Sequence, residues 1–198
     1  VLIKPENEEW GINLLTDPFS IELTDENRDV ITLIEGIERK NRSDTEVTLA
    51  LQENEHLYGT GERFNGADQR GRSLQIWAED QWCETEGNSY IPIPFVMSSG
   101  KYALFMNRYE ASEMDLGSTD EKRIILLQHD TELDLYVCTA KTPEQTLRVF
   151  SELWGKPAVP PEWVFGVLVS RHTRTEEFSS PEGVLEMADQ MDEHDITL

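Results

Sequence analysis

Glu46-Val-Thr-Leu-Ala-Leu51 alternates polar and apolar side chains, which is the pattern of a β-strand with one buried face. Ile21-Glu-Leu-Thr24 alternates in the same way, and the β-branched run Val30-Ile-Thr-Leu-Ile34 lies between turn residues. Outward from this stretch, short runs of the same kind recur from residue 10 to about residue 138. Many short strands cut by turn residues predict a mainly β chain folded as a sandwich.

Three further runs extend the predicted sandwich. Tyr102-Ala-Leu-Phe-Met106 follows the turn-like Ser98-Ser-Gly100. Arg123-Ile-Ile-Leu-Leu127 and Glu132-Leu-Asp-Leu-Tyr-Val137 are separated by a short polar segment that contains His129. This spacing predicts that the last two runs pair as a hairpin.

The periodicity changes from strand to helix at Thr142. Thr142, Pro143 and Gln145 match an N-cap, a proline in the first turn and a capping-box partner, and Gly155 supplies a stop. Pro157, Pro160 and Pro161 then indicate a stiff linker. We expect residues 1–141 to form the sandwich and residues 142–161 to form a helix and a proline-rich linker.

Residues 162–198 resemble one β-loop-α unit. Trp163-Val-Phe-Gly-Val-Leu-Val169 is a continuous apolar run, as in a parallel strand that is buried on both faces. Ser180-Pro181-Glu182 opens a second helix, which ends at His194-Asp195. A lone parallel strand lacks partners, so the rest of a barrel or a doubly wound sheet is expected beyond Leu198.

Composition excludes several classes of function. The formal net charge of −22 argues against nucleic acid and anionic membrane surfaces as partners. No apolar run reaches the roughly 18–20 residues of a membrane span, and no signal peptide is visible. Cys83 and Cys138 show no metal-ligand or disulfide-scaffold spacing, so we expect two free thiols in a reducing cytoplasm. The chain lacks an initiator Met and is expected to be a piece of a longer protein.

General catalytic motifs are missing from the sequence. We find no G-x-S-x-G elbow, phosphate-binding loop or HExxH motif. The four histidines, His56, His129, His172 and His194, share no metal-ligand spacing and are interpreted as lone surface residues. We therefore expect no metal and no organic cofactor.

Aromatic and acidic residues gather between positions 58 and 95. Tyr58-Gly-Thr-Gly-Glu-Arg-Phe64 is followed by Trp77-Ala-Glu-Asp80 and then Trp82. Apolar sugar faces stack on aromatic rings, and carboxylates accept hydrogen bonds from sugar hydroxyls, so the segment suggests a sugar site. Asp80 lies in a long loop and is either a sugar ligand or a solvated acid.

Two other positions allow both a functional and a structural interpretation. Glu62-Arg63 fits a functional pair less well than an ion pair that locks a tight glycine turn. Ser170-Arg-His172 directly follows the predicted parallel strand, where ligand sites of α/β sheets and barrels lie, but it also fits an ordinary polar loop.

Taken in order, the motifs resemble glycoside hydrolase family 31, the α-glucosidase and α-xylosidase family. The ordered set covers residues 58–198 and is specific, although each piece alone is weak. The matching pieces are Tyr58-Gly-Thr-Gly-Glu-Arg-Phe64, Trp77-Ala-Glu-Asp80, Tyr90-Ile-Pro-Ile-Pro-Phe95, Ser98-Ser-Gly100, Thr142-Pro143, Gly155-Lys-Pro157, Pro160-Pro-Glu-Trp163 and Phe165-Gly166.

The resemblance implies a galactose-mutarotase-like β-sandwich followed by the first β-α unit, residues 162–198, of a truncated (β/α)8 barrel. It places the glycone-binding aspartate of a sandwich loop at Asp80, with Trp82 on the same rim. His172 stands where the family usually has an aromatic residue after the first barrel strand, so the sequence departs from the family pattern at this position. The two catalytic aspartates of such retaining enzymes are expected on later barrel strands, so this piece alone is expected to be inactive.

The resemblance thus implies an exo-acting α-glycosidase whose partner is an oligosaccharide or another α-glycoside. A non-catalytic carbohydrate-binding module and an α-transglycosylase on the same scaffold remain open, as does a homo-oligomer. A mutarotase-like epimerase would need a His/Glu acid–base pair on the strands, and the sequence shows no convincing one.

Overall fold

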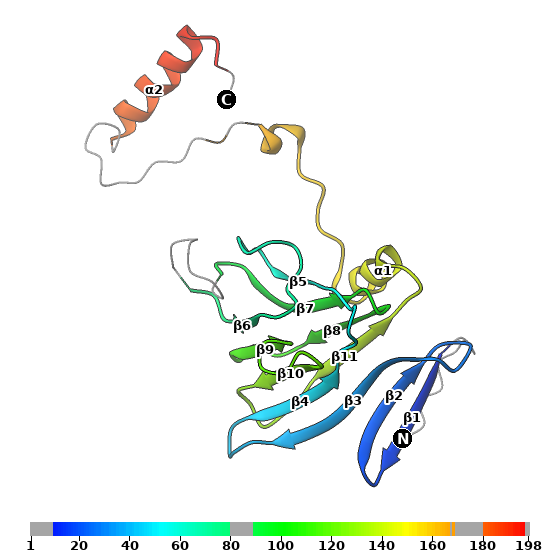
Figure 1. Cartoon of the computed structure of the whole chain (residues 1–198). Helices are drawn as coiled ribbons and strands as arrows, with labels where there is room; N and C mark the ends of the chain where they lie inside the picture. The colour runs from blue at the N-terminus through cyan, green and yellow to red at the C-terminus, as the bar shows by residue number, and fades with distance from the viewer. Residues whose placement is uncertain (1–9, 80–88, 167, 169–179, 197–198) are drawn as a thin grey trace. The chain divides into compact units, whose positions relative to one another are not determined.

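The computed structural model describes residues 10–79, 89–166, 168 and 180–196. The chain divides into two units, Val1–Gly155 and Lys156–Leu198, and each is described by itself. Among these described residues, the first unit contains two β-sheets and one helix, and the second contains a 3-10 helix and one α-helix (Figure 1).

The first unit is built from antiparallel strands in two sheets, as the alternating sequence runs predict. One sheet has seven strands in the order β1-β2-β3-β4-β10-β9-β6, and the other has four strands in the order β11-β8-β7-β5. The seven strands are, in chain order, β1 (Gly11–Thr16), β2 (Phe19–Thr24), β3 (Val30–Arg39), β4 (Thr45–Ala50), β6 (Ser73–Ile76), β9 (Ser112–Leu116) and β10 (Arg123–Gln128). The four strands are β5 (Leu57–Gly61), β7 (Pro92–Ser98), β8 (Tyr102–Met106) and β11 (Leu135–Thr139).

A single apolar core lies between the two sheets. It is formed by the inward-facing residues of alternating strands, so β4 contributes Val47 and Leu49 while Thr48 faces outward. On the opposite sheet Tyr102 and Leu104 of β8 point into the same core. This packing confirms the predicted β-sandwich.

The predicted hairpin between residues 123–127 and 132–137 is wrong. Both edges of β10 are occupied, by β4 and by β9, so β11 has no place beside it and pairs with β8 in the other sheet. The connection from β10 to β11 passes from one sheet to the other and is held by side chains that follow β8. Arg108 contacts Asp130 and Glu132, and the side-chain amide of Asn107 donates to the Asp134 carboxylate at 2.7 Å.

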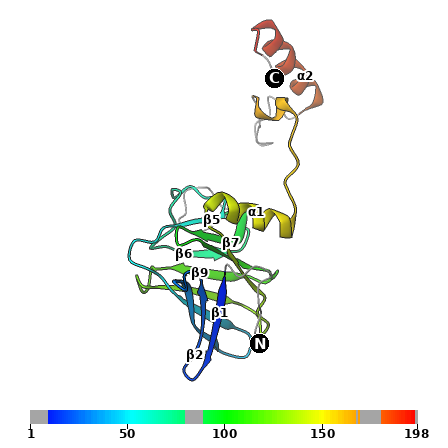
Figure 2. The ribbon, with the colours of Figure 1, turned by 90° about the vertical axis from the view of Figure 1, so that its right-hand side faces the viewer.

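Helix α1 (Pro143–Trp154) packs on the outer face of the four-stranded sheet against β7 and β11. Figure 2 shows α1 beside β7. The predicted start of α1 is confirmed, because the Thr142 side chain accepts a hydrogen bond from the Gln145 amide. The ring centroids of Phe150 and Phe95 lie 4.3 Å apart, and those of Trp154 and Phe105 are separated by the same distance. Cys138 is a free, buried thiol beneath this helix, and burial raises its pKa.

The second unit departs from the sequence prediction at its beginning. Glu162–Phe165 forms a 3-10 helix instead of the start of a strand, and Trp163 and Phe165 are exposed. A parallel strand requires hydrogen-bonding neighbours, and the described part of this unit contains no strand to supply them. Helix α2 (Pro181–Glu193), capped by the Ser180 hydroxyl, agrees with the prediction.

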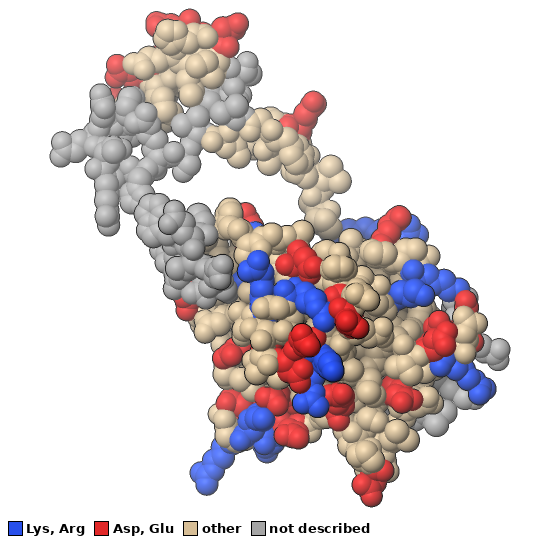
Figure 3. Space-filling model, viewed as in Figure 1, with Lys and Arg blue, Asp and Glu red and all other residues tan. Residues whose placement is uncertain are grey.

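Charged side chains of both signs are interspersed on the viewed face of the first unit (Figure 3). In the described part of the chain, no helix is both long enough and apolar enough to cross a membrane.

Candidate functional site

The site is built on a strained turn at the end of β5. Gly59, Thr60 and Gly61 all have positive φ, at 118°, 68° and 92°, and the pairing of β5 with β7 shifts register at this point. A Cβ on Gly61 would collide with the Ile91 carbonyl oxygen and would lie 2.7 Å from the Ile93 nitrogen. Both glycines are therefore required by backbone geometry, as the sequence predicts.

Arg63 holds this turn through two main-chain carbonyl oxygens and one hydroxyl oxygen. Its Nε donates to the carbonyl and hydroxyl oxygens of Thr60, both at 3.0 Å, and its Nη2 donates to the Gln75 carbonyl at 3.0 Å. Burial lowers the pKa of the guanidinium from its ordinary value. These contacts join the end of β5 to the end of β6, so Arg63 holds the turn through Thr60 and Gln75. The ion pair between Glu62 and Arg63 stays a prediction.

The same turn holds both ends of the segment between Glu79 and Ser89. The Ser89 hydroxyl donates to the Glu62 carbonyl at 2.5 Å and accepts from the Ile91 amide at 3.1 Å. The Glu62 amide donates to the Ile91 carbonyl at 3.0 Å, and the Glu79 amide donates to the Ser89 carbonyl at 3.3 Å. A parallel bridge between Ala78 and Ser89 brings the two ends of the segment side by side.

The three site residues predicted from the sequence, Asp80, Trp82 and His172, lie outside the described residues. Asp80 directly follows Glu79, so it is joined to the fixed base described above. The sequence motifs did not predict a role for the Ser89 hydroxyl, which directly precedes the quoted stretch Tyr90-Ile-Pro-Ile-Pro-Phe95.

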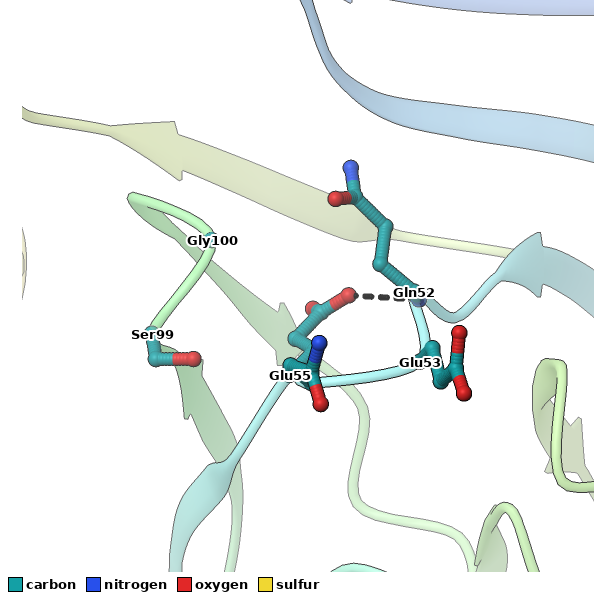
Figure 4. A pocket seen from close by; sticks show the side chains of 6 residues that line it. Gln52, Glu53, Glu55, Ser99 and Gly100 are labelled. Carbon is teal, nitrogen blue, oxygen red and sulfur yellow. Dashed lines mark hydrogen bonds between the residues drawn. The ribbon is translucent and has the colours of Figure 1, made fainter.

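A hollow of about 320 Å³ lies between the β4–β5 and β7–β8 connections (Figure 4). The Glu55 carboxylate at its base is only 4% exposed and accepts hydrogen bonds from Gln52 N at 2.9 Å, from Tyr102 Oη at 2.5 Å and from the Ser98 hydroxyl. Burial, followed by the charge of Glu55, raises the pKa of Tyr102. Because this buried carboxylate already accepts three hydrogen bonds from the protein, we interpret it as a structural link between the two connections.

Two histidines predicted to be lone surface residues have carboxylate partners. His56 Nδ1 lies 2.7 Å from Asp68, and His129 Nδ1 and Nε2 lie 3.2 Å from Asp44 and 3.4 Å from Glu113. Glu113 is on β9 and His129 directly follows β10, so folding brings this His and this Glu together at the end of one strand. Within the described ranges, no three His, Cys, Asp or Glu side chains are arranged to hold a metal ion.

Comparison with protein families gives a match over most of the first unit. The model of the glycosyl hydrolase 31 N-terminal galactose mutarotase-like domain matches residues 6–115. An α-xylosidase of Emericella nidulans is 35% identical over 135 residues, which cover 68% of this chain and 17% of that protein. An α-xylosidase of Lactiplantibacillus pentosus is 31% identical over 150 residues, which cover 76% of this chain and 19% of that protein. The chain thus spans about a fifth of the length of these curated relatives.

Solved structures show the same fold. A family 31 dextranase of Flavobacterium johnsoniae, a mutant complexed with isomaltotriose, has a TM-score of 0.83 at 20% identity and covers 99% of this chain and 25% of that one. A cycloalternan-forming enzyme of Listeria monocytogenes, in complex with a pentasaccharide substrate, has a TM-score of 0.82 at 19% identity. The match covers 99% of this chain and 20% of that one. Identities this low establish the fold alone.

Proposed function

The chain belongs to glycoside hydrolase family 31, and we propose that it is the N-terminal region of a retaining, exo-acting α-glycosidase that cleaves α-glucoside or α-xyloside bonds. The observation that carries the proposal is the family match over residues 6–115 together with α-xylosidases and α-glucosidases among the relatives. The role of this chain would be to complete a sugar pocket with the segment that follows Glu79.

The fixed base of that segment supports this role. Glu79 and Ser89, at the two ends of the segment, are hydrogen-bonded to each other, and the Ser89 hydroxyl donates to the Glu62 carbonyl beside the glycine turn. Arg63 in turn holds the glycine turn through the Thr60 carbonyl. A binding group must be held within a fraction of an ångström of its working position, and a rigid scaffold provides that precision. Asp80 would accept hydrogen bonds from hydroxyls of the terminal sugar, and Trp82 would line the rim beside it.

The remaining parts of the proposed site belong to the barrel. Residues 162–198 would supply the first strand and helix of a (β/α)8 barrel, with His172 at the carboxyl end of that strand. The family resemblance places two catalytic aspartates on later strands. In a retaining enzyme such carboxyls stand roughly 5 Å apart, and one attacks the anomeric carbon while the other protonates the leaving oxygen. Water, activated by the second carboxyl, then hydrolyses the glycosyl-enzyme.

The decisive experiment compares the full-length protein with the 198-residue chain on aryl α-glucosides and aryl α-xylosides. We expect the full-length protein to release the α-anomer first, seen by NMR before mutarotation, and the 198-residue chain to release nothing. No hydrolysis by the full-length protein, or release of the β-anomer, would refute the proposal.

Two alternatives give different outcomes in simple assays. A carbohydrate-binding module would bind maltose or isoprimeverose as the 198-residue chain with an affinity equal to that of the full-length protein. A transglycosylase would yield longer oligosaccharides from a sugar donor, where a hydrolase yields free monosaccharide. Placement in the cytoplasm is part of the same proposal, and fractionation of the native host cell tests it.

A further inference from the structure

A small hollow lies on the outer face of the seven-stranded sheet, at its β6 edge. Its volume is about 160 Å³, and it is lined by Gln75, Trp77, Ala111, Ser112, Glu113 and His129. Leu74 and Ile76 of β6 are buried in the core, so the alternation of the strand turns Gln75 outward. Gln75 pairs with Glu113 of β9, which is also turned outward. The hollow is therefore framed by regular, fixed strands.

The wall of the hollow includes an exposed indole. Trp77 directly follows β6 and is 51% exposed. Burial of the exposed part of this ring against a ligand would be favourable, because removing apolar surface from water stabilises a complex. The flat face of the indole suits a ligand that is apolar on one side and polar at its edges.

The polar groups in the hollow are held in place by one another. The His129 imidazole contacts Asp44 at 3.2 Å through Nδ1 and Glu113 at 3.4 Å through Nε2, and the His129 amide donates to the Ala111 carbonyl at 3.1 Å. Hydrogen bonds from Asn41 and then from His129 hold the pKa of Asp44 below its usual range. The side chain of Glu113 is 44% exposed, so its carboxylate can also accept hydrogen bonds from outside.

We propose that this hollow binds one pyranose unit of a neutral α-linked oligosaccharide, with Trp77 stacked on the ring and Glu113 accepting its hydroxyls. A volume of about 160 Å³ suits a single six-membered ring, since a cavity of roughly 150 Å³ takes up benzene. The carboxylates of Asp44 and Glu113 disfavour anionic sugars. The choice of an α-linked sugar as ligand rests on the proposed function, whereas the hollow itself does not.

The test is a titration of the ¹⁵N-labelled 198-residue chain with methyl α-D-glucopyranoside, methyl α-D-xylopyranoside and, as a polyol without a ring, glycerol. The indole N–H signal of Trp77, assigned by its loss in Trp77→Phe, reports binding. We expect a saturable shift with at least one glycoside, with a Kd on the order of 1 mM, and no saturation with glycerol. A shift that fails to saturate with both glycosides, or that saturates equally with glycerol, would overturn the proposal.

Variants separate a built site from chance contact. Saturation-transfer NMR on Trp77→Ala and on Glu113→Ala should show affinity at least about tenfold weaker, which corresponds to about 1.4 kcal/mol. The matched control is Phe19→Ala, because Phe19 is also a partly exposed aromatic side chain but lies on β2, near the opposite edge of the same sheet. Unchanged affinity in Trp77→Ala or in Glu113→Ala, or an equal loss in Phe19→Ala, would contradict the assignment.

Failure of the proposed function would be seen elsewhere. If the full-length protein does not hydrolyse aryl α-glycosides, the proposed enzyme function is wrong. The titration of the 198-residue chain still tests sugar binding in the hollow, because it does not depend on catalysis.

Discussion

Replacement of Gly61 by alanine tests the strained turn on which the proposed site rests. Gly61 and Gly66 both have φ of +92°. A Cβ on Gly66 meets no atom within 4 Å, whereas a Cβ on Gly61 collides with the Ile91 carbonyl and lies 2.9 Å from Pro92 Cα. The two glycines therefore share the same backbone strain and differ in their surroundings, so Gly66→Ala is a matched control.

The expected magnitude follows from these contacts. Positive φ costs an alanine roughly 1–2 kcal/mol, and this is the whole cost expected for Gly66→Ala. Gly61→Ala must in addition displace the main chain at residues 91–93. That displacement breaks the pairing of Gly61 with Pro92 and the hydrogen bond from Glu62 N to Ile91 O, with about 1 kcal/mol for each lost interaction. We expect Gly61→Ala to lower the free energy of unfolding by about 3–4 kcal/mol.

The assay is urea unfolding of the 198-residue chain, followed by far-UV circular dichroism, with m-values compared so that only changes in the midpoint count as stability. A difference of about 2 kcal/mol between the two variants corresponds to roughly 4–8 °C in Tm. Equal losses of stability in Gly61→Ala and Gly66→Ala, within about 0.5 kcal/mol, would refute the claim that the β7 backbone presses on this turn.

Two further predictions concern buried and paired carboxylates. Glu55→Ala leaves the buried hydroxyl of Tyr102 without its acceptor and should lower the free energy of unfolding by about 2–4 kcal/mol. The control is Glu53→Ala, a change of an exposed neighbour, which should alter the free energy of unfolding by no more than about 0.5 kcal/mol. Equal melting temperatures of the two variants would contradict the structural role of Glu55. For Asp68, desolvation opposes ionisation, but hydrogen bonds from His56, Arg70 N and Leu57 N outweigh it and hold the pKa of the carboxyl below its ordinary value. A lowered folded-state pKa gives stability that is fully present above the unfolded value near 3.9 and is lost as the pH falls through the folded value. The advantage of wild type over Asp68→Asn, under about 1 kcal/mol because the pair is exposed, should shrink between pH 6 and pH 3, and an advantage that grows on acidification would rule this out.

Much of the fold follows from local sequence signals. Both helices begin where a hydroxyl N-cap precedes a proline, and those signals act within one helical turn, so Thr142 and Ser180 were identified correctly. The strands around Val47 and Leu49 were identified because alternation directly reports one buried face. The choice of sheet is not local, and β11 was given the wrong partner because the occupation of β10 by β4 and β9 depends on distant residues.

The candidate site was less predictable for the same reason. The glycine turn was recognised, since tight backbone has a composition signal at Gly59 and Gly61. The partners of Arg63 were not, because main-chain carbonyls carry no residue identity. His129 was taken for a lone side chain, yet its partner Asp44 lies 85 positions away and only folding brings the two together. The role of Asp80 stays a prediction.

The central claim is that this chain contributes a sugar-binding group to the active site through the segment held by Arg63 and Ser89. Its most direct measurement is kcat/KM of the full-length protein on an aryl α-glycoside, for wild type, Asp80→Ala and the exposed helix control Glu152→Ala. The account predicts that Asp80→Ala lowers kcat/KM by about a hundredfold, corresponding to about 2.7 kcal/mol of lost transition-state binding, and that Glu152→Ala leaves it unchanged. An Asp80→Ala enzyme as active as wild type would contradict the claim.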